Sequence, residues 1–169
     1  MDSPDGDAAE LPSHETAALV TALRLLQFVA VILTALALVP SGAHLFELPH
    51  KIVLSKEQYF AVQAVYRGWA FFGTVIVAAL GANLAVAVML FRRGRRFWPS
   101  LAAGLILGGT LVVFFVWTYP ANLATNNWTV VAADWKGLRV EWELSHAANA
   151  VLTFAAFCCA TLSAVISGD

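Results

Sequence analysis

Charged side chains are scarce in this sequence of 169 residues. Asp, Glu, Lys and Arg make up only 12% of the chain, whereas 60% of the residues are hydrophobic. Soluble domains carry about a quarter charged residues. The formal net charge is −1, which does not favour binding to nucleic acid, since that depends on neutralising phosphates with excess Lys and Arg. The composition predicts an integral membrane protein with no nucleic-acid partner.

Several motifs and patterns are also missing. The sequence has no Gly-rich phosphate loop, no nucleophile elbow and no c-type haem motif. Its two cysteines, Cys158 and Cys159, are adjacent, so they point to different faces of a helix and predict no disulfide framework. No segment alternates apolar and polar residues with the period of a strand, and a bilayer excludes open sheet edges. The sequence therefore predicts an all-α fold.

Four apolar stretches are long enough to cross a bilayer as helices, which takes about 20 residues. With their polar ends included, they cover about residues 17–48, 58–91, 97–118 and 138–166. The sequence therefore predicts a four-helix membrane bundle formed by residues 17–169. Residues 1–16 are acidic, contain proline and lack a basic start, so we interpret them as a disordered cytoplasmic tail and not as a signal peptide.

The dense basic cluster Arg92 to Arg96 joins the second and third stretches. The positive-inside rule places this short loop in the cytoplasm. With four spans, both termini are then expected in the cytoplasm, while the loops at 40–58 and 119–142 face outwards. We expect the protein in the plasma (inner) membrane of a bacterium, in contact with the lipid bilayer.

Polar side chains are concentrated at the outer ends of the predicted spans. His44 and Glu47 follow the apolar part of the first span, and Glu143 and His146 begin the fourth. Further polar or aromatic members of this outer layer are Tyr59, Gln63, Tyr66, Arg67, Asn122, Asn126, Asn127, Trp142 and Asn149. Polar groups at membrane depth are costly, so they are either paired with one another or present for chemistry.

A metal site is the first of three hypotheses for this layer. His44-x-x-Glu47 and Glu143-x-x-His146 have the spacing with which helical bundles bind di-iron centres. The second and third spans offer no further carboxylates at that depth. The pattern therefore favours a mononuclear site of His44, His146 and Glu47 or Glu143, with His50 as a further ligand, and such ligands suit Fe, Cu or Zn.

Acid–base chemistry without a metal is the second hypothesis. His146, oriented by Glu143, would abstract a proton near neutral pH, and Arg67 would stabilise the resulting oxyanion. The substrate-binding residues predicted for this site are Gln63, Tyr66, Asn122, Asn127, Trp142 and Asn149.

A purely structural network is the third hypothesis. Arg139 and Glu143 are spaced for an i, i+4 pair, and Glu47 is in a position to pair with Lys51 or Arg67. His146 and Asn149 would then hydrogen-bond across helices. Gly104 and Gly108 form a small-xxx-small pattern that favours close helix contact, either within one chain or in a homo-oligomer.

The sequences YPANLATNNW (119–128) and WKGLRVEWELSHAAN (135–149) resemble a family of small four-span membrane proteins grouped with the anthrone oxygenases. The residues that carry the resemblance are Pro120, Asn122, Trp128, Leu138, Arg139, Trp142, Glu143 and His146. The resemblance implies an oxygenase that acts on a lipophilic, often aromatic, small molecule.

The implied chemistry fits either of the two chemical hypotheses. An anthrone has an acidic ring CH2, and its deprotonation gives a carbanion that reacts with O2 without a cofactor. The same layout would also suit a metal that activates O2. The alternative function is a non-catalytic membrane protein that binds a metal, haem or lipid, or that serves as a small subunit of a membrane complex.

Overall fold

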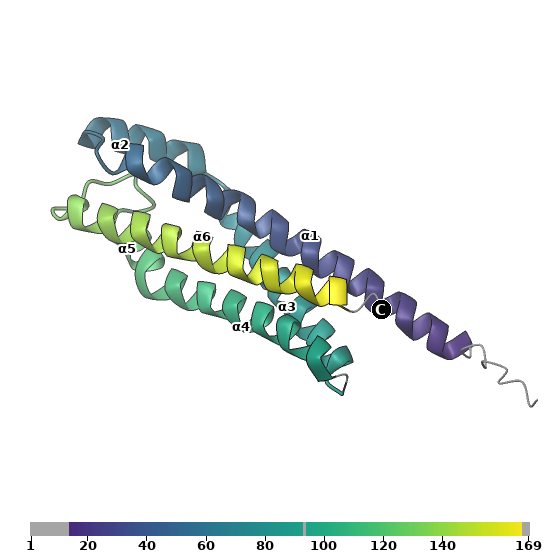
Figure 1. The fold of residues 1–169 in the computed structure, drawn as a ribbon. Helices are drawn as coiled ribbons and strands as arrows, with labels where there is room; N and C mark the ends of the chain where they lie inside the picture. Colours follow the sequence, from purple (N-terminus) through teal and green to yellow (C-terminus); the bar gives the residue numbers. More distant parts are fainter. Residues whose placement is uncertain (1–13, 93, 167–169) are drawn as a thin grey trace, which may run out of the picture.

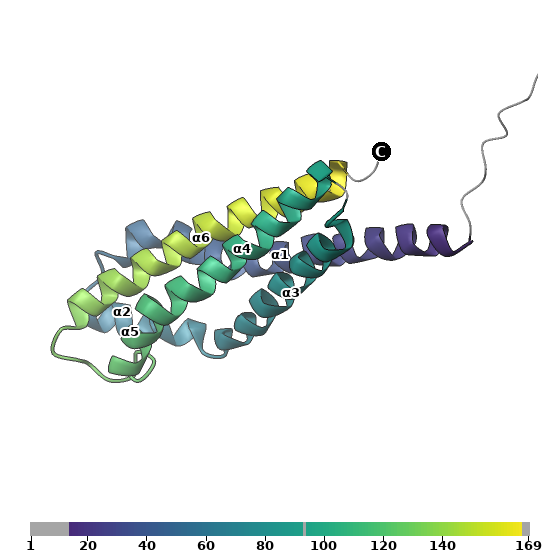
Figure 2. The same cartoon turned by 90° about the horizontal axis from the view of Figure 1, so that it is seen from below.

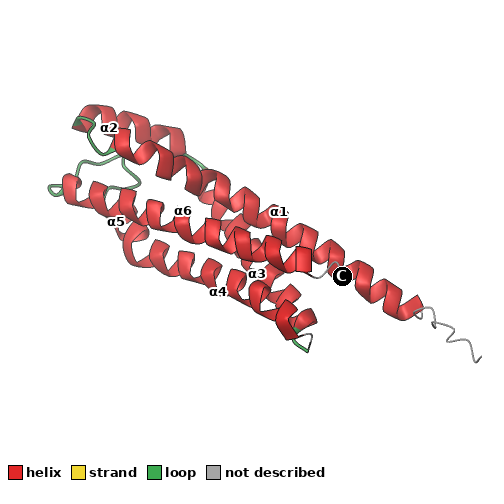
Figure 3. Ribbon diagram, in the orientation of Figure 1, coloured by secondary structure: helices red, strands yellow, loops and turns green. Residues whose placement is uncertain are grey.

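The computed structural model describes residues 14–92 and 94–166, and within them the chain is all-helical, with turns and loops but no strand (Figures 1 and 3). The α-helices are α1 (His14–Lys51), α2 (Lys56–Gln63), α3 (Phe72–Leu90), α4 (Phe97–Val113), α5 (Tyr119–Ala124) and α6 (Trp135–Ile166). Short 3-10 helices η1 (Ala64–Tyr66), η2 (Trp69–Phe71) and η3 (Gly94–Arg96) and a π-helical segment η4 (Phe114–Thr118) connect them.

Four helical segments are long and apolar enough to cross a membrane, which confirms the predicted fold class. They are His14–Lys51, Trp69–Leu90, Phe97–Ala124 and Trp135–Ile166. Each packs against two neighbours: α1 and α4 both contact α3 and α6. The large apolar side chains that remain exposed on these helices therefore face outwards, where a bilayer would cover them.

The second predicted span, 58–91, is not one continuous helix. A capping box begins α2: the Ser55 hydroxyl accepts from the Gln58 backbone N–H, and the Gln58 side chain accepts from the Ser55 N–H. After η1 the chain turns at Gly68, whose φ of +86° is readily adopted only by glycine. The membrane-length segment begins at Trp69, and α2 lies back alongside the end of α1 (Figure 1).

The boundaries of the other predicted spans differ less from those of the observed helices. The first helix begins at His14, so residues 14–16 of the predicted tail are helical, while 1–13 lie outside the described residues. The third segment continues beyond residue 118 because the π-helical turn η4 passes directly into α5. Helix α1 runs through Pro40 and reaches Lys51, which keeps the outer-layer residues of the first span on one helix.

Small and polar residues fill the contacts between helices, as is typical of membrane bundles. Buried alanines at these contacts are Ala30, Ala37, Ala79, Ala103, Ala156 and Ala160. A Cβ on Gly104 would come within 2.6 Å of the Leu84 side chain on α3, so this glycine serves packing within the chain. Gly108 has open space beside it. Cys158 and Cys159 are free thiols.

Polar bonds between helices also occur in the half of the bundle near η3, away from the predicted polar outer layer. The Asn83 amide donates to Thr34 Oγ1 at 3.1 Å, and the hydroxyls of Ser100 and Ser163 are 2.5 Å apart. The Gln27 side chain donates to the Ser163 carbonyl at 3.2 Å. These bonds join all four long helices.

The two ends of the bundle differ in composition. The end of α6 and η3 lie at one end of the bundle, and the start of α1 projects beyond them on the same side (Figures 1 and 2). The short helix α2 and the loop before α6 lie at the opposite end, where the polar outer-layer residues gather.

Candidate functional site

Two histidines from different helices face each other at this polar end. His44 on α1 and His146 on α6 have ring centroids 4.2 Å apart with an interplanar angle of 35°. The Trp142 ring packs against both, at 5.0 Å from His44 and 4.2 Å from His146. His44 is buried, and its Nδ1 has no hydrogen-bond partner among the described residues. The two imidazoles thus form one unit held by aromatic contacts.

Glu143 is fully buried and is paired with a cation that sequence reasoning did not assign to it. The Lys51 ammonium lies 3.0 Å from Glu143 Oε1, and the Tyr59 hydroxyl donates to the same oxygen at 3.0 Å. The exposed fractions of the two charged side chains are 0% for Glu143 and 4% for Lys51. These partners replace the predicted contact between Glu143 and His146, so Glu143 does not orient that imidazole.

Aromatic rings surround the Lys51 ammonium. Its Nζ is 4.4 Å from the ring centroid of Tyr66, 4.6 Å from that of Trp142 and 5.7 Å from that of Tyr59. Cation–π attraction of this kind is stronger when the cation is removed from water. The Glu143 carboxylate and three rings, with Glu47 at 3.9 Å, therefore compensate a buried ammonium at the end of α1.

The predicted Arg139–Glu143 pair does not form. Arg139 instead donates to the Leu54 carbonyl at 2.9 Å, and its guanidinium lies 4.9 Å from the ring centroid of Trp135. The i, i+4 spacing brings the two side chains onto one helix face, but Glu143 is taken by Lys51, which arrives from a different helix.

Glu47 forms a second carboxylate cluster beside the first. The Tyr66 hydroxyl donates to Glu47 Oε2, and the Lys51 ammonium is 3.9 Å from the same oxygen, so the predicted Glu47–Lys51 contact is present. Burial raises the pKa of Tyr66 above the ordinary tyrosine value, and the bond to Glu47 adds to this. Burial likewise raises the pKa of Tyr59, aided by the negative charge of Glu143. Both phenols therefore stay protonated and act as donors to carboxylates.

The four predicted metal ligands are divided between these clusters. His44 and His146 contact each other, whereas Glu47 and Glu143 are held by Lys51 and tyrosines. Within residues 14–92 and 94–166 no group of three or more His, Cys, Asp or Glu side chains is arranged to hold a metal ion. His50, the further ligand considered, is exposed at the end of α1.

A large cavity adjoins the histidine pair. Its volume is about 780 Å³, which lies in the size range of small-molecule sites. His44, His146 and Arg67 line it, whereas Glu47 and Glu143 are not among its lining residues. All six predicted substrate-binding residues line it as well: Gln63, Tyr66, Asn122, Asn127, Trp142 and Asn149. Its remaining walls are mainly apolar and come from α3, α4 and η4: Phe72, Ile76, Val77, Leu111, Phe114 and Phe115.

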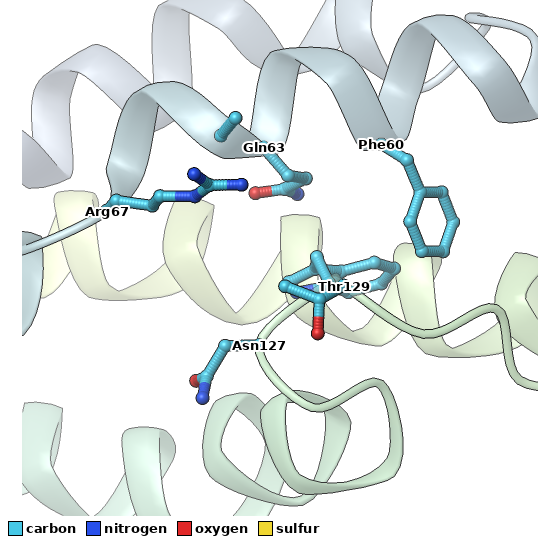
Figure 4. Close-up of a pocket in the computed structure, with 7 residues that line it drawn as sticks. Phe60, Gln63, Arg67, Asn127 and Thr129 are labelled. Carbon is cyan, nitrogen blue, oxygen red and sulfur yellow. The ribbon is translucent and has the colours of Figure 1, made fainter.

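A second cavity of about 260 Å³ lies between α2 with η1 on one side and the loop after α5 on the other (Figure 4). Phe60, Gln63 and Arg67 form one wall, and Asn127 and Thr129 face them from the loop. In Figure 4 the Arg67 side chain extends towards Gln63. Because Gln63, Arg67 and Asn127 also line the larger cavity, the two cavities adjoin.

The loop that closes this end has an unusual backbone. Asn126, Asn127 and Trp128 have φ values of +46°, +54° and +61°, a left-handed conformation that asparagine tolerates but a bulky residue rarely adopts. The Thr125 hydroxyl accepts from the Trp128 backbone N–H at 3.1 Å, and the Trp128 ring is buried beside Tyr59 and Trp142. Burial of the ring thus accompanies the strained backbone.

Sequence reasoning did not assign site roles to Lys51, Trp69 and Trp128. Trp69 packs 5.6 Å from His44 and lines the larger cavity. In the sequence, a site role for these residues is indicated only by their position next to the predicted outer layer. Tryptophan at a membrane boundary is also typical of an interfacial belt, so that position did not distinguish the two roles. Trp142, which was predicted, is fixed by a 2.9 Å bond from its indole N–H to Asn122 Oδ1.

Comparisons with known proteins give no match: no protein-family model, no curated protein and no solved structure matches the chain. The cavity and its side chains are therefore the basis for assigning a function.

Proposed function

We propose that the protein is a membrane oxidoreductase of the anthrone-oxygenase type, which oxidises a lipophilic aromatic substrate with O2 in the larger cavity. The observation that carries the proposal is the cavity itself. Its walls are mostly apolar, its volume of about 780 Å³ suits a small aromatic molecule, and it leads to two imidazoles in mutual contact.

In this proposal His146 is the catalytic base. It lines the cavity and is partly exposed, whereas the neighbouring His44 is buried. A neutral, positioned imidazole can act as a general base, and here the proton comes from an acidic ring CH2 of the substrate. The rings of His44 and Trp142 orient the base, at 4.2 Å each. This is the role that the sequence hypothesis gave to Glu143.

Deprotonation leaves a carbanion whose negative charge is shared with the ring oxygen of the substrate. Arg67 lines the cavity and supplies a positive charge for that oxygen. The carbanion then reduces O2: the CH2 carbon gains one oxygen atom as a carbonyl, and the second oxygen leaves as water with the two hydrogens of the CH2 group. The carbon is oxidised and O2 is the electron acceptor.

Glu143 acts in this proposal as a positioning residue. Through Lys51 and Tyr59 it joins α6 to the end of α1 and to α2, the elements that hold His44, Gln63 and His146. A buried, hydrogen-bonded charge pair fixes the relative placement of helices when its partners are complete.

In the proposed orientation, η3, the start of α1 and the end of α6 lie on the cytoplasmic side of a bacterial plasma membrane. Support comes from Arg92 and Arg96 at that end of the bundle. The cavity then lies towards the outer leaflet. A second copy would pack at Gly108, which has open space beside it, and not at Gly104, which is already occupied within the chain.

A second candidate function is non-catalytic binding of a lipophilic molecule. The observation that favours it is the binding of Glu47 Oε2 and Glu143 Oε1 by Lys51 and tyrosines, while neither carboxylate hydrogen-bonds a histidine in the described site.

Oxygen consumption with anthrone separates the two functions. The purified protein in lipid nanodiscs is expected to take up O2 faster than anthrone alone, and His146→Ala should lower that rate by at least about 100-fold, the usual minimum for a general base. His50→Ala is the matched control, because His50 is exposed and does not line the cavity. If the unsubstituted protein binds anthrone but O2 uptake is no faster than with anthrone alone, the function is non-catalytic. An unchanged rate of O2 uptake in His146→Ala would refute the assigned base.

A further inference from the structure

Arg67 is the one Asp, Glu, Lys or Arg side chain that lines either cavity among the residues that the structure describes. The two carboxylates of the polar end, Glu47 and Glu143, line neither cavity. Lys51 is within 4 Å of both carboxylates, at 3.0 Å and 3.9 Å.

Arg67 is the arginine whose charge faces the cavities. Arg139 donates to a backbone carbonyl and packs on a ring, away from both cavities. The Arg67 guanidinium makes no hydrogen bond or ion pair with any residue that the structure describes, and Arg67 lines both cavities where they adjoin. A guanidinium in this setting is suited to bind an anionic oxygen.

The walls around Arg67 also offer N–H donors. Gln63 and Trp128 are buried and line both cavities. Gln63 Nε2 and Trp128 Nε1 have no acceptor among the described residues. Buried donors are normally paired, so small side-chain movements towards a ligand oxygen would satisfy them. This junction is rich in donors and lacks a free carboxylate, which favours a ligand with acceptor oxygens.

The far part of the larger cavity is apolar and lies between α3 and α4. These helices are in close contact near η3, where Gly104 meets Leu84 and the rings of Phe91 and Phe97 are 5.4 Å apart. They lie side by side in Figure 2 and are joined through η3.

Beside the cavity the surface of α3 is open. A Cβ on Gly73 of α3 would meet no atom within 4 Å. Val77 on α3 and Phe115 in η4 line the cavity and yet are 55% and 61% exposed. The π-helical turn η4, a geometry often found at functional sites, lies at this level. The cavity thus opens between two membrane-length helices, on a side that a bilayer would cover.

We infer that the two cavities together bind one anionic amphiphile: an ionised carboxylate or phenolate at Arg67, with an apolar aromatic body between α3 and α4 that arrives from the bilayer. The inference rests on the cavity of the proposed function and specifies its ligand class. The Arg67 guanidinium selects the head group, and the side opening admits the apolar body without passage through water.

A pair of unreactive probes tests the head-group assignment. Binding of anthracene-9-carboxylate and of its methyl ester is measured by equilibrium dialysis against protein in phosphatidylcholine nanodiscs, with empty nanodiscs subtracted. The carboxylate is expected to bind about ten-fold or more tightly, as one charge-assisted hydrogen bond predicts. Arg67→Gln should remove this preference while ester binding stays unchanged, which also reports intact folding. Arg24→Gln, an exposed arginine that does not line either cavity, is the matched control.

Two glycine substitutions on α3 test where the apolar body lies. Gly73→Trp places a large ring at the opening and should weaken binding of both probes at least about ten-fold. Gly81→Trp is the control, since Gly81 is exposed on the same helix, has open space beside it and does not line the cavity.

Equal affinity of the unsubstituted protein for acid and ester, or unaltered binding in Gly73→Trp, would overturn the inference. Because neither probe is oxidised, these results are independent of anthrone turnover. If the protein does not oxidise anthrone but still prefers the carboxylate probe, it is an anion-selective binding protein.

Discussion

Separating Lys51 from Glu143 should destabilise the bundle strongly. Both side chains are almost fully buried and their charged atoms are 3.0 Å apart. Removing one partner of a buried ion pair costs about 3–5 kcal/mol, because the remaining charge loses its compensation. Lys51→Met leaves the Glu143 carboxylate with only the Tyr59 hydroxyl as donor. It also removes the cation–π contacts of Tyr66 and Trp142, which are worth about 1–2 kcal/mol.

The double variant distinguishes this coupling from simple loss of packing. In Lys51→Met combined with Glu143→Gln no charge stays buried, and the uncharged amide still accepts from Tyr59. We therefore expect a cost below the sum of the two single variants by about 2 kcal/mol or more, the range of coupled neighbours. Free energies of unfolding would be measured by denaturant titration in detergent micelles.

The exposed ion pair of Lys56 and Glu57 is the control for this cycle. Its atoms are 3.5 Å apart, but both side chains are in solvent, so Lys56→Met should change stability little. Additive effects of the two buried substitutions, or a Lys51→Met cost no larger than that of Lys56→Met, would refute the ion pair as a stabilising element.

Three further outcomes follow from the site and the topology. Anthrone oxidation should persist in EDTA, because both carboxylates of the site are already bound by Lys51 and tyrosines; loss of turnover that Fe, Cu or Zn restores would establish a metal site instead. Burial raises the pKa of Tyr59 and Tyr66, so the folded protein holds these protons more tightly than the unfolded chain. Its unfolding free energy should be fully retained below about pH 10 and fall at higher pH, with a smaller fall when both tyrosines are replaced by Phe. After replacement of the two native cysteines, Arg92→Cys should react with an impermeant thiol reagent only from the cytoplasmic side and Val131→Cys only from the outside; labelling with reversed sidedness would invert the topology.

Hydropathy and helix spacing predicted most of the bundle and the composition of its polar end. The four spans follow from apolar length, and the convergence of His44 with His146 follows from similar membrane depth on two helices. The break at Gly68 was not predictable from hydropathy, because apolar residues continue on both sides of it. It depends on the capped start of α2 and on one left-handed glycine.

The pairing within the site was harder to predict. Glu143 has a cation four residues away on its own helix, yet it binds Lys51, which reaches it because α1 continues through Pro49 to its end at Lys51. Sequence spacing describes neighbours on one helix. The partner of Glu143 depends instead on how α1 and α6 are rotated about their axes and shifted along them relative to each other. The same limit applies to Trp128, whose ring enters the site from a loop with left-handed backbone.

Isotope labelling during anthrone oxidation tests whether the protein is an oxygenase that uses the histidine pair. With 18O2 and the purified protein, we expect one 18O atom in the new carbonyl of the quinone and the other in water, formed faster than in protein-free nanodiscs. This labelled product should decrease to the protein-free level in His146→Ala and be retained in His50→Ala. Formation of the labelled quinone at the protein-free rate, or equal rates in both variants, would contradict an oxygenase that uses the histidine pair.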